Sequence, residues 1–259
     1  MMKSEKRQEI ISHVKDFYDK KTVVITGGFG YVGKFLVHKL LRLNVVKEIL
    51  LIARPKKGKL GAERLDKLFS GFLFQNMADF DPNYKAKVKV INGDMELNDL
   101  GISSDDREYI KENAEVVIHG AASLVMEGKL QQTLASNVRG TKILLDLALE
   151  MKSLQSFVFI STAFSQYPLK YVEEKFYKPP MDFREALKLL EKFKDEDAMD
   201  ALTAKLLGTS ANIYTFSKAI TEDMIRQYQD KLPIAIARPS QGSTTASCRQ
   251  PANSIEIFF

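Results

Sequence analysis

Cysteine and histidine are scarce in this chain of 259 residues, which contains one cysteine, Cys248, and three histidines. A single cysteine excludes a disulfide within the chain, so we expect a reducing, intracellular compartment. His13, His38 and His119 lie far apart in the sequence, and none stands near the cysteine at a spacing typical of metal ligands. The sequence therefore predicts no metal site.

Long apolar runs and concentrated positive charge are also missing. No stretch of 18 consecutive apolar residues occurs, and the charged residues 1–21 contain no apolar segment of a secretory signal. We therefore expect neither a transmembrane segment nor a signal peptide. The net charge is +5, but the 38 basic residues are interleaved with 33 acidic ones. Nucleic-acid binding usually needs a concentrated basic surface, so we expect no nucleic-acid partner.

Short apolar runs alternate with patterns of helical spacing along most of the chain. The predicted strands are 23–25, 48–53, 88–92, 116–119, 157–160 and 234–237. The predicted helices include one that follows the first strand, 104–113, 130–152 and one that begins near Tyr214. Continuous apolar strands separated by helices are typical of a parallel sheet covered on both faces. The predicted fold class is α/β, a Rossmann-type doubly wound parallel sheet with helices on both faces.

The same patterns predict three regions. Residues 1–20 form an amphipathic N-terminal extension, and residues 21–240 form the main domain. Two amphipathic stretches near 181–210 predict a helical insertion on the substrate side, whose apolar faces would cover a ligand or belong to the ordinary core. Residues 241–259 lose periodicity and collect Ser, Thr, Gln and Pro, which is typical of a loosely structured tail.

A glycine-rich turn, Thr26-Gly27-Gly28-Phe29-Gly30-Tyr31-Val32-Gly33, lies where the first predicted strand ends and a helix begins. Gly27 and Gly30 would permit a tight turn close to a pyrophosphate, and Gly33 would let the helix pack against the strand. The backbone N–H groups at the start of that helix, including those of Tyr31 and Val32, would bind the phosphates. The turn therefore predicts a dinucleotide site, although a plain glycine-rich loop is the alternative.

The segment after the second predicted strand favours NADP(H) over NAD(H). It contains Arg54 and Lys57 and lacks the acid that binds the ribose 2′-OH of NAD. The two cations would bind a 2′-phosphate, or else they are solvated surface charges. Asp94, after the third strand, would bind the adenine amino group or serve as a turn residue. Ala121, after the fourth strand, would leave space for a ribose.

A tyrosine and a lysine four residues apart occur twice, as Tyr171/Lys175 and Tyr214/Lys218. On a helix such a pair shares one face, so the ammonium lowers the phenol pKa and holds the nicotinamide ribose, as in short-chain dehydrogenases. Tyr171 lies beside Pro168 among turn residues, whereas Tyr214 opens a strongly patterned helix. We therefore predict that Tyr214 and Lys218 form the catalytic pair.

Two further polar positions complete the predicted site. Thr162 follows the fifth predicted strand and would hydrogen-bond the substrate carbonyl oxygen, with Ser161 as the alternative. Either hydroxyl would otherwise cap a helix or turn. Asn137 lies inside the long predicted helix. It would bridge to Lys218 through water or be a structural polar residue.

These residues together resemble the extended short-chain dehydrogenase/reductase family, and more closely the N-terminal domain of alcohol-forming fatty acyl-CoA reductases. The motifs that carry the resemblance are TGGFGYVG, LLIARPKKGK, HGAASL, NVRGT, FVFISTAFSQ and NIYTFSK. The resemblance begins near residue 17 and ends at residues 238–240. Residues 241–259 match nothing in the family pattern, so we expect the family's C-terminal domain to be absent.

The resemblance implies NADPH-dependent reduction of a long-chain acyl-CoA to a fatty alcohol through an aldehyde, with Tyr214, Lys218 and Thr162 protonating the carbonyl oxygen. It implies an acyl-CoA substrate and a peroxisomal or endoplasmic-reticulum association, with the cytosol as the alternative, and it leaves a homo-oligomer open. Two other hypotheses stay open. One is an extended-family reductase or epimerase for a steroid, flavonoid or nucleotide sugar. The other is a nucleotide-binding module without activity, which the unmatched tail suggests.

Overall fold

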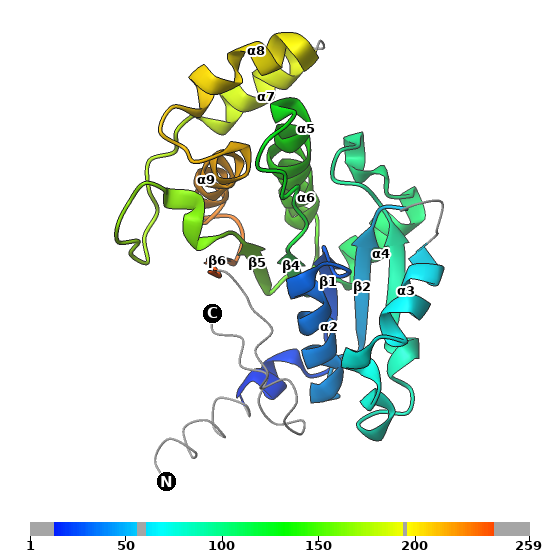
Figure 1. The fold of residues 1–259 in the computed structure, drawn as a ribbon. Coiled ribbons are helices and arrows are strands. Elements are labelled where there is room, and N and C mark those ends of the chain that lie inside the picture. Colours follow the sequence, from blue (N-terminus) through cyan, green and yellow to red (C-terminus); the bar gives the residue numbers. More distant parts are fainter. Residues whose placement is uncertain (1–12, 56–60, 194–195, 241–259) are drawn as a thin grey trace.

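The computed structural model describes residues 13–55, 61–193 and 196–240, shown in Figure 1. In the described part of the chain six parallel strands form one sheet in the order β3-β2-β1-β4-β5-β6. The strands are β1 (Thr22–Thr26), β2 (Glu48–Ala53), β3 (Val88–Asn92), β4 (Val116–His119), β5 (Ser156–Ile160) and β6 (Ile234–Ala237). The predicted doubly wound α/β fold is confirmed, and each predicted strand matches an observed one to within one residue at either end.

Every residue of β1 is buried, although its side chains alternate between the two faces of the sheet. Helices therefore cover both faces. Val23 and Ile25 pack with helix α2 (Tyr31–Leu43) and helix α3 (Gly61–Phe69) in one apolar core. Val24 belongs to a second core on the opposite face. That core also holds buried side chains from α4 (Ser104–Asn113), α6 (Gly140–Leu149) and α9 (Ile213–Arg226).

The strand order reverses at β1, because the chain runs outward from β1 through β2 to β3 and then returns to place β4 on the other side of β1. In open α/β sheets a ligand crevice forms at such a reversal, beyond the carboxyl ends of the strands. The ends of β1, β4 and β5 therefore mark the expected binding edge.

The long helix predicted at 130–152 is interrupted. It consists of α5 (Leu130–Leu134), a π-helical turn (Ala135–Arg139) and α6. Within the wider turn, the main-chain oxygen of Asn137 accepts hydrogen bonds from the hydroxyls of Thr141 and Thr221 at 2.7 and 3.1 Å. The predicted long helix is therefore present, and it contains a π-helical turn where side-chain hydroxyls from two elements bond the same carbonyl.

The helical insertion consists of α7 (Phe183–Lys192) and α8 (Glu196–Leu207), which lie next to α5 at one end of the molecule (Figure 1). Phe183, Ala186 and Met199 are buried in the core that covers this face of the sheet. Core packing therefore accounts for these apolar positions. Short 3₁₀ turns occupy Phe72–Phe74, Met77–Asp79, Tyr84–Lys87, Asn98–Gly101 and Ala163–Gln166.

Candidate active site

A cleft of about 470 Å³ opens at the carboxyl edge of the sheet, where the strand order reverses. The glycine turn and the end of β2 line one part of it, and α9 with the end of β5 lines another. The described residues predicted for the site that line the cleft are Gly27, Gly30, Tyr31, Val32, Gly33, Arg54, Asp94, Ala121, Thr162, Tyr214 and Lys218. Residues from the ends of five strands and the starts of two helices therefore meet in one cavity.

The glycine turn has no room for side chains at two positions. A Cβ atom on Gly33 would lie 2.2 Å from the main-chain oxygen of Gly27, and Gly27 itself has a φ of +75°. Gly30 precedes α2 and offers no side chain to cap it. The N–H groups of Tyr31 and Val32 in the first helical turn therefore face the cleft without a side-chain partner. This arrangement fits a pyrophosphate.

Two arginines stand at the far end of the cleft, beyond β2. Arg54 donates to Glu96 over 3.2 Å and lies 3.9 Å from the carboxylate of Asp94. Arg64, on α3, stacks over the ring of Phe29 at 4.2 Å and donates to the main-chain oxygen of Arg54. Burial, and then the charge of Arg54, lower the pKa of Arg64. Both arginines line the cleft, and their charges are close enough to influence one another.

Arg64 was not predicted, because its contribution depends on how α3 folds back beside the glycine turn. A basic residue about ten positions after Arg54, on a helix of this topology, is the signal that sequence alone offers. The acids around Arg54 come from the loop after β3, and Asp94 accepts from the N–H of Glu96 at 3.0 Å. The predicted contact of Asp94 with adenine stays a prediction. Lys57 lies outside the described residues.

Tyr214 and Lys218 lie on one face of α9, a helix that begins in a well-defined way. Asn212 and Thr215 form a capping box, in which each side chain bonds the backbone N–H of the other residue. This cap places Tyr214 in the first turn of the helix, at the mouth of the cleft. Lys218 lies one turn further on and is 2 % exposed.

The Lys218 ammonium is buried and has few polar neighbours to stabilise its charge. It donates to the main-chain oxygen of Ile160 over 2.8 Å and lies 4.4 Å from the centre of the Phe159 ring. Burial lowers the pKa of Lys218 to about 7, although the charge of Glu222 acts in the opposite direction. The group therefore exchanges its proton near neutral pH, the range in which a proton relay works best.

Burial is also the largest effect on the pKa of the Tyr214 phenol. It raises the pKa of Tyr214 above 10, and a hydrogen bond with the Thr162 side chain lowers it in part. The lysine was expected to lower this pKa, but in the structure the cost of burying a phenolate is the larger effect. The phenol is therefore protonated over the whole neutral range and is available as a proton donor.

The hydroxyls after β5 are used differently. Ser161 donates its hydroxyl proton to Glu222 over 2.5 Å, so this proton is not available to a ligand in the cleft. The Thr162 oxygen accepts from the N–H of Phe164 at 3.3 Å, which makes it the cap of a 3₁₀ turn. A hydroxyl that accepts there retains its own proton for donation. Thr162 is therefore the hydroxyl of this pair that stands ready beside Tyr214.

The second tyrosine–lysine pair lies elsewhere. Tyr171 is 85 % exposed in an irregular segment between β5 and α7. Lys175 forms an ion pair with Glu173 and lies 5.3 Å from the ring centre of Tyr177. The i,i+4 spacing does not place these two side chains on a helix. This pair has the right spacing but neither the helix nor the burial that proton transfer needs.

A hydrogen-bonded chain connects the glycine turn to the π-helical turn. The N–H of Ala121 donates to the Thr26 hydroxyl over 3.0 Å, and that hydroxyl lies 2.6 Å from Nδ1 of His119. Nε2 of His119 lies 2.8 Å from the Thr141 hydroxyl, which donates to Asn137. Burial lowers the pKa of His119 to about 3, so the ring is neutral and Nε2 carries its proton.

The Asn137 side chain joins the loop after β4 to α9 by hydrogen bonds. Its side chain accepts from the N–H of Ser123 at 2.7 Å, donates to the oxygen of the same residue at 3.1 Å, and donates to the Ser217 hydroxyl at 2.8 Å. Each polar atom of this side chain is thus engaged in holding the loop after β4 against α9. The predicted water bridge to Lys218 stays a prediction.

Within residues 13–55, 61–193 and 196–240, no group of three or more histidine, cysteine, aspartate or glutamate side chains is placed to hold a metal ion. Over the same residues, no helix combines the length and the apolar character that crossing a bilayer requires.

Solved structures share this fold. One is the terminal R domain of the myxalamid PKS-NRPS biosynthetic pathway, with a TM-score of 0.63 and 19 % identity over 86 % of this chain and 49 % of that one. Another is the R domain of a nonribosomal peptide synthetase from Mycobacterium tuberculosis, with a TM-score of 0.59 and 23 % identity over 86 % and 48 % of the two chains. At these identities the likeness concerns the fold alone.

Sequence comparison identifies the family. Residues 25–251 match the NAD-binding family model described as male sterility protein, so the expectation that residues 241–259 match nothing in the family is wrong for residues 241–251. The chain is 39 % identical to fatty acyl-CoA reductase wat of Drosophila melanogaster over 96 % of this chain and 49 % of the relative. It is 33 % identical to human fatty acyl-CoA reductase 1 over 88 % of this chain and 44 % of the relative. The chain thus spans about half the length of the curated relatives it matches, and it belongs to the fatty acyl-CoA reductase family, whose NAD(P)-binding domain it carries.

Proposed function

We propose that this chain reduces long-chain acyl-CoA thioesters to fatty alcohols through an aldehyde, with NADPH as the reductant. The observation that carries the proposal is the meeting of Tyr214, Thr162 and Lys218 in the same cleft as the glycine turn. A proton donor and a dinucleotide cradle in one cavity are what carbonyl reduction requires. The homology to fatty acyl-CoA reductases supports the choice of a thioester.

The cleft suits NADPH at both ends. Gly27, Gly30 and the start of α2 would hold the pyrophosphate, while Arg54 and Arg64 would bind the 2′-phosphate of the adenosine ribose. No acid follows β2 at the position that would bind a free 2′-OH. Bound NADPH would supply the hydride that the carbonyl carbon accepts.

The protein's own groups would handle the charge that develops on the carbonyl oxygen. The protonated phenol of Tyr214 would donate its proton to that oxygen, and the Thr162 hydroxyl would hydrogen-bond it. Lys218, with a pKa of about 7, would replace the lost proton and hold the ribose beside it. Collapse of the hemithioacetal, whose hydroxyl proton leaves with the CoA sulfur as free thiol, would give an aldehyde, and a second NADPH would supply the hydride that reduces the aldehyde to the alcohol.

The mouth of the cleft favours an acyl chain over a sugar. Leu124 lines the cleft and is 68 % exposed, and Val125 and Met126 beside it are 49 % and 61 % exposed. Three consecutive exposed apolar side chains at the entrance to a site are typical of a surface that binds an apolar ligand. A nucleotide sugar would instead need polar partners at this position.

The test uses purified protein, NADPH and palmitoyl-CoA, with loss of NADPH absorbance followed together with fatty alcohol by mass spectrometry. We expect both signals in the wild type, and we expect Tyr214→Phe to lose both by a factor of roughly 100 or more. The matched control is Tyr171→Phe, which changes the exposed tyrosine of the same spacing and should leave turnover intact.

Other outcomes would decide against the proposal. Reduction of a ketone substrate with no attack on thioesters would assign the chain to another reductase class. NADPH binding, measured by fluorescence, without turnover of any carbonyl would assign it to nucleotide-binding modules that lack activity.

A further inference from the structure

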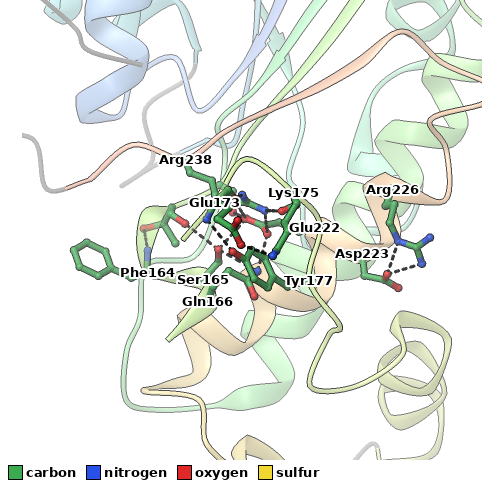
Figure 2. Close-up of polar contacts among 12 residues, drawn as sticks. Phe164, Ser165, Gln166, Glu173, Lys175, Tyr177, Glu222, Asp223, Arg226 and Arg238 are labelled. Atoms are coloured by element: carbon green, nitrogen blue, oxygen red, sulfur yellow. Dashed lines mark hydrogen bonds and ion pairs between the residues drawn. The ribbon is translucent and has the colours of Figure 1, made fainter. Parts of the chain in front are cut away.

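A buried carboxylate lies directly behind the catalytic groups of α9. The two oxygens of Glu222, whose side chain is 3 % exposed, accept hydrogen bonds from several side chains at once (Figure 2). The donors are Ser161 at 2.5 Å, Ser165 and Gln166 at 2.8 Å each, and two nitrogens of Arg238 at 2.9 Å each. Both oxygens are fully engaged, and every donor comes from outside α9.

Three of these donors flank Thr162 in the sequence. Ser161 precedes it directly, and Ser165 and Gln166 belong to the 3₁₀ turn that it caps. On the other side of the contact, Glu222 follows Lys218 by four residues and Tyr214 by eight, so all three lie on one stripe of the helix. Glu222 therefore joins the element that carries Thr162 to the element that carries Tyr214 and Lys218.

Arg238 extends the connection to the segment before α7. Its guanidinium pairs with Glu222 and also donates to the main-chain oxygens of Glu173 at 3.2 Å and Lys175 at 2.9 Å. It lies 5.9 Å from the ring centre of Tyr177 as well. The guanidinium therefore holds this irregular segment through its backbone, and the bidentate contact with Glu222 fixes the guanidinium.

We propose that Glu222 is a positioning residue for the reaction: through Ser161, Ser165, Gln166 and Arg238 it holds the Thr162 turn and the 173–175 backbone in register with Tyr214 and Lys218. This proposal rests on the proposed reduction only for its kinetic readouts. Loss of the carboxylate would therefore remove the contacts that join α9 to the Thr162 turn and, through Arg238, to the 173–175 backbone.

The charge of Glu222 has a second effect, on Lys218. Among the described residues, the titratable groups that face this pair are Tyr214 on the same helix, His119 from β4, Arg238 after β6 and Tyr177 before α7. Glu222 is the anion that raises the pKa of Lys218 against the effect of burial. A neutral side chain at position 222 should therefore lower the lysine pKa further.

The neighbouring residue provides a matched control. Asp223 is also buried on α9, and it also pairs with an arginine, Arg226, at 2.7 Å. Figure 2 shows this second pair pointing away from the Glu222 cluster. The side-chain oxygens of Asp223 accept from Arg226 and Gln227, at the end of the same helix. Asp223→Asn therefore removes a buried carboxylate without removing the connection.

The experiment compares wild type, Glu222→Gln, Glu222→Asp and Asp223→Asn, each checked for cooperative thermal unfolding. With NADPH and palmitoyl-CoA, we expect Glu222→Gln to lose roughly tenfold or more in kcat with an unchanged KM for NADPH. The pH above which kcat falls should be lower in Glu222→Gln than in the wild type. Glu222→Asp, which keeps the charge, should bring this pH back toward the wild-type value. Asp223→Asn should have the kcat and the pH dependence of the wild type. A Glu222→Gln profile that matches that of Asp223→Asn in kcat and pH dependence overturns the proposal.

Two readouts without turnover separate this proposal from the proposed function. The first is tryptic cleavage after Lys175, whose carbonyl Arg238 holds, and it should become several-fold faster in Glu222→Gln than in Asp223→Asn. The second is competitive labelling of Lys218, read by mass spectrometry, which reports its pKa directly. If the wild type reduces no thioester but both readouts shift, the function fails and the positioning role stands. If neither shifts, the positioning role is wrong whatever the activity.

Discussion

The Nζ atom of Lys218 lies 2.8 Å from the main-chain oxygen of Ile160, the last residue of β5. This contact ties the helix that carries Tyr214 to the strand end that carries Thr162. It also places the ammonium in a buried position, where charge is costly. The hydrogen bond positions the ammonium and burial lowers its pKa, and the first two predictions follow from these two facts.

The first prediction concerns the pH dependence of the rate. The ammonium form of Lys218 is the one that can return a proton to Tyr214, and the lysine pKa is about 7. We therefore expect kcat/KM for thioester reduction to fall as pH rises through about 7. A rate that stays flat to about pH 10 would show that this proton is not used.

The second prediction concerns stability. Folding lowers the pKa of Lys218 from 10.5 to about 7, so the unfolded chain binds more protons between these values. The free energy of unfolding should therefore rise with pH across this window, and the penalty of burying the ammonium is complete below about 7. Lys218→Met removes that penalty. Urea unfolding should show a more stable variant at pH 6, with the difference shrinking toward pH 10, and a constant difference would contradict the account.

The third prediction concerns the choice of nucleotide. Arg54→Ala and Arg64→Ala should each weaken NADPH binding roughly tenfold or more while leaving NADH binding nearly unchanged, since only NADPH carries the 2′-phosphate. Fluorescence titration measures both affinities. Arg42→Ala is the matched control, because Arg42 also stacks over an aromatic ring, at 4.4 Å from Phe80, but does not line the cleft. Equal losses for NADPH and NADH would contradict the proposed phosphate site.

The fourth prediction concerns the glycine turn. Gly33→Ala would push a methyl group against the Gly27 backbone, which cannot yield without breaking the turn, so we expect nucleotide binding to be lost. Gly28→Ala would meet only the end of the Leu51 side chain, at 2.7 Å, which can move. It should bind nucleotide with a smaller loss of affinity. Comparable binding by the two variants would argue against a tight fit at Gly33.

Local patterns predicted most of the fold. The strands were recognisable because they are buried on both faces, which produces continuous apolar runs such as TVVIT and EILLIA. The glycine turn and the helix that begins near Tyr214 were recognisable because backbone constraints and caps act over a few residues. Tyr214 was preferred to Tyr171 on such local grounds, and the structure places Tyr214 on a helix in the cleft and Tyr171 in exposed, irregular backbone.

Long-range contacts were beyond the reach of such patterns. The π-helical turn depends on hydroxyls that reach Asn137 from Thr221, 84 residues away. Arg64 enters the cleft only because α3 folds against the glycine turn. No local pattern marks Glu222, since its donors lie 16 to 61 residues away in sequence. A buried charge is satisfied by tertiary structure, so its importance is visible only there.

The most direct test of the account follows the reducing hydrogen into the product. Palmitoyl-CoA is incubated with NADPH that is fully deuterated at C4 of the nicotinamide, and the alcohol is analysed by mass spectrometry. We predict that the wild type forms hexadecanol with two deuterons on C1, and that Tyr214→Phe, which binds NADPH equally well, forms almost none. Unlabelled alcohol, or no alcohol from a wild-type protein that binds NADPH, would contradict the proposed reaction.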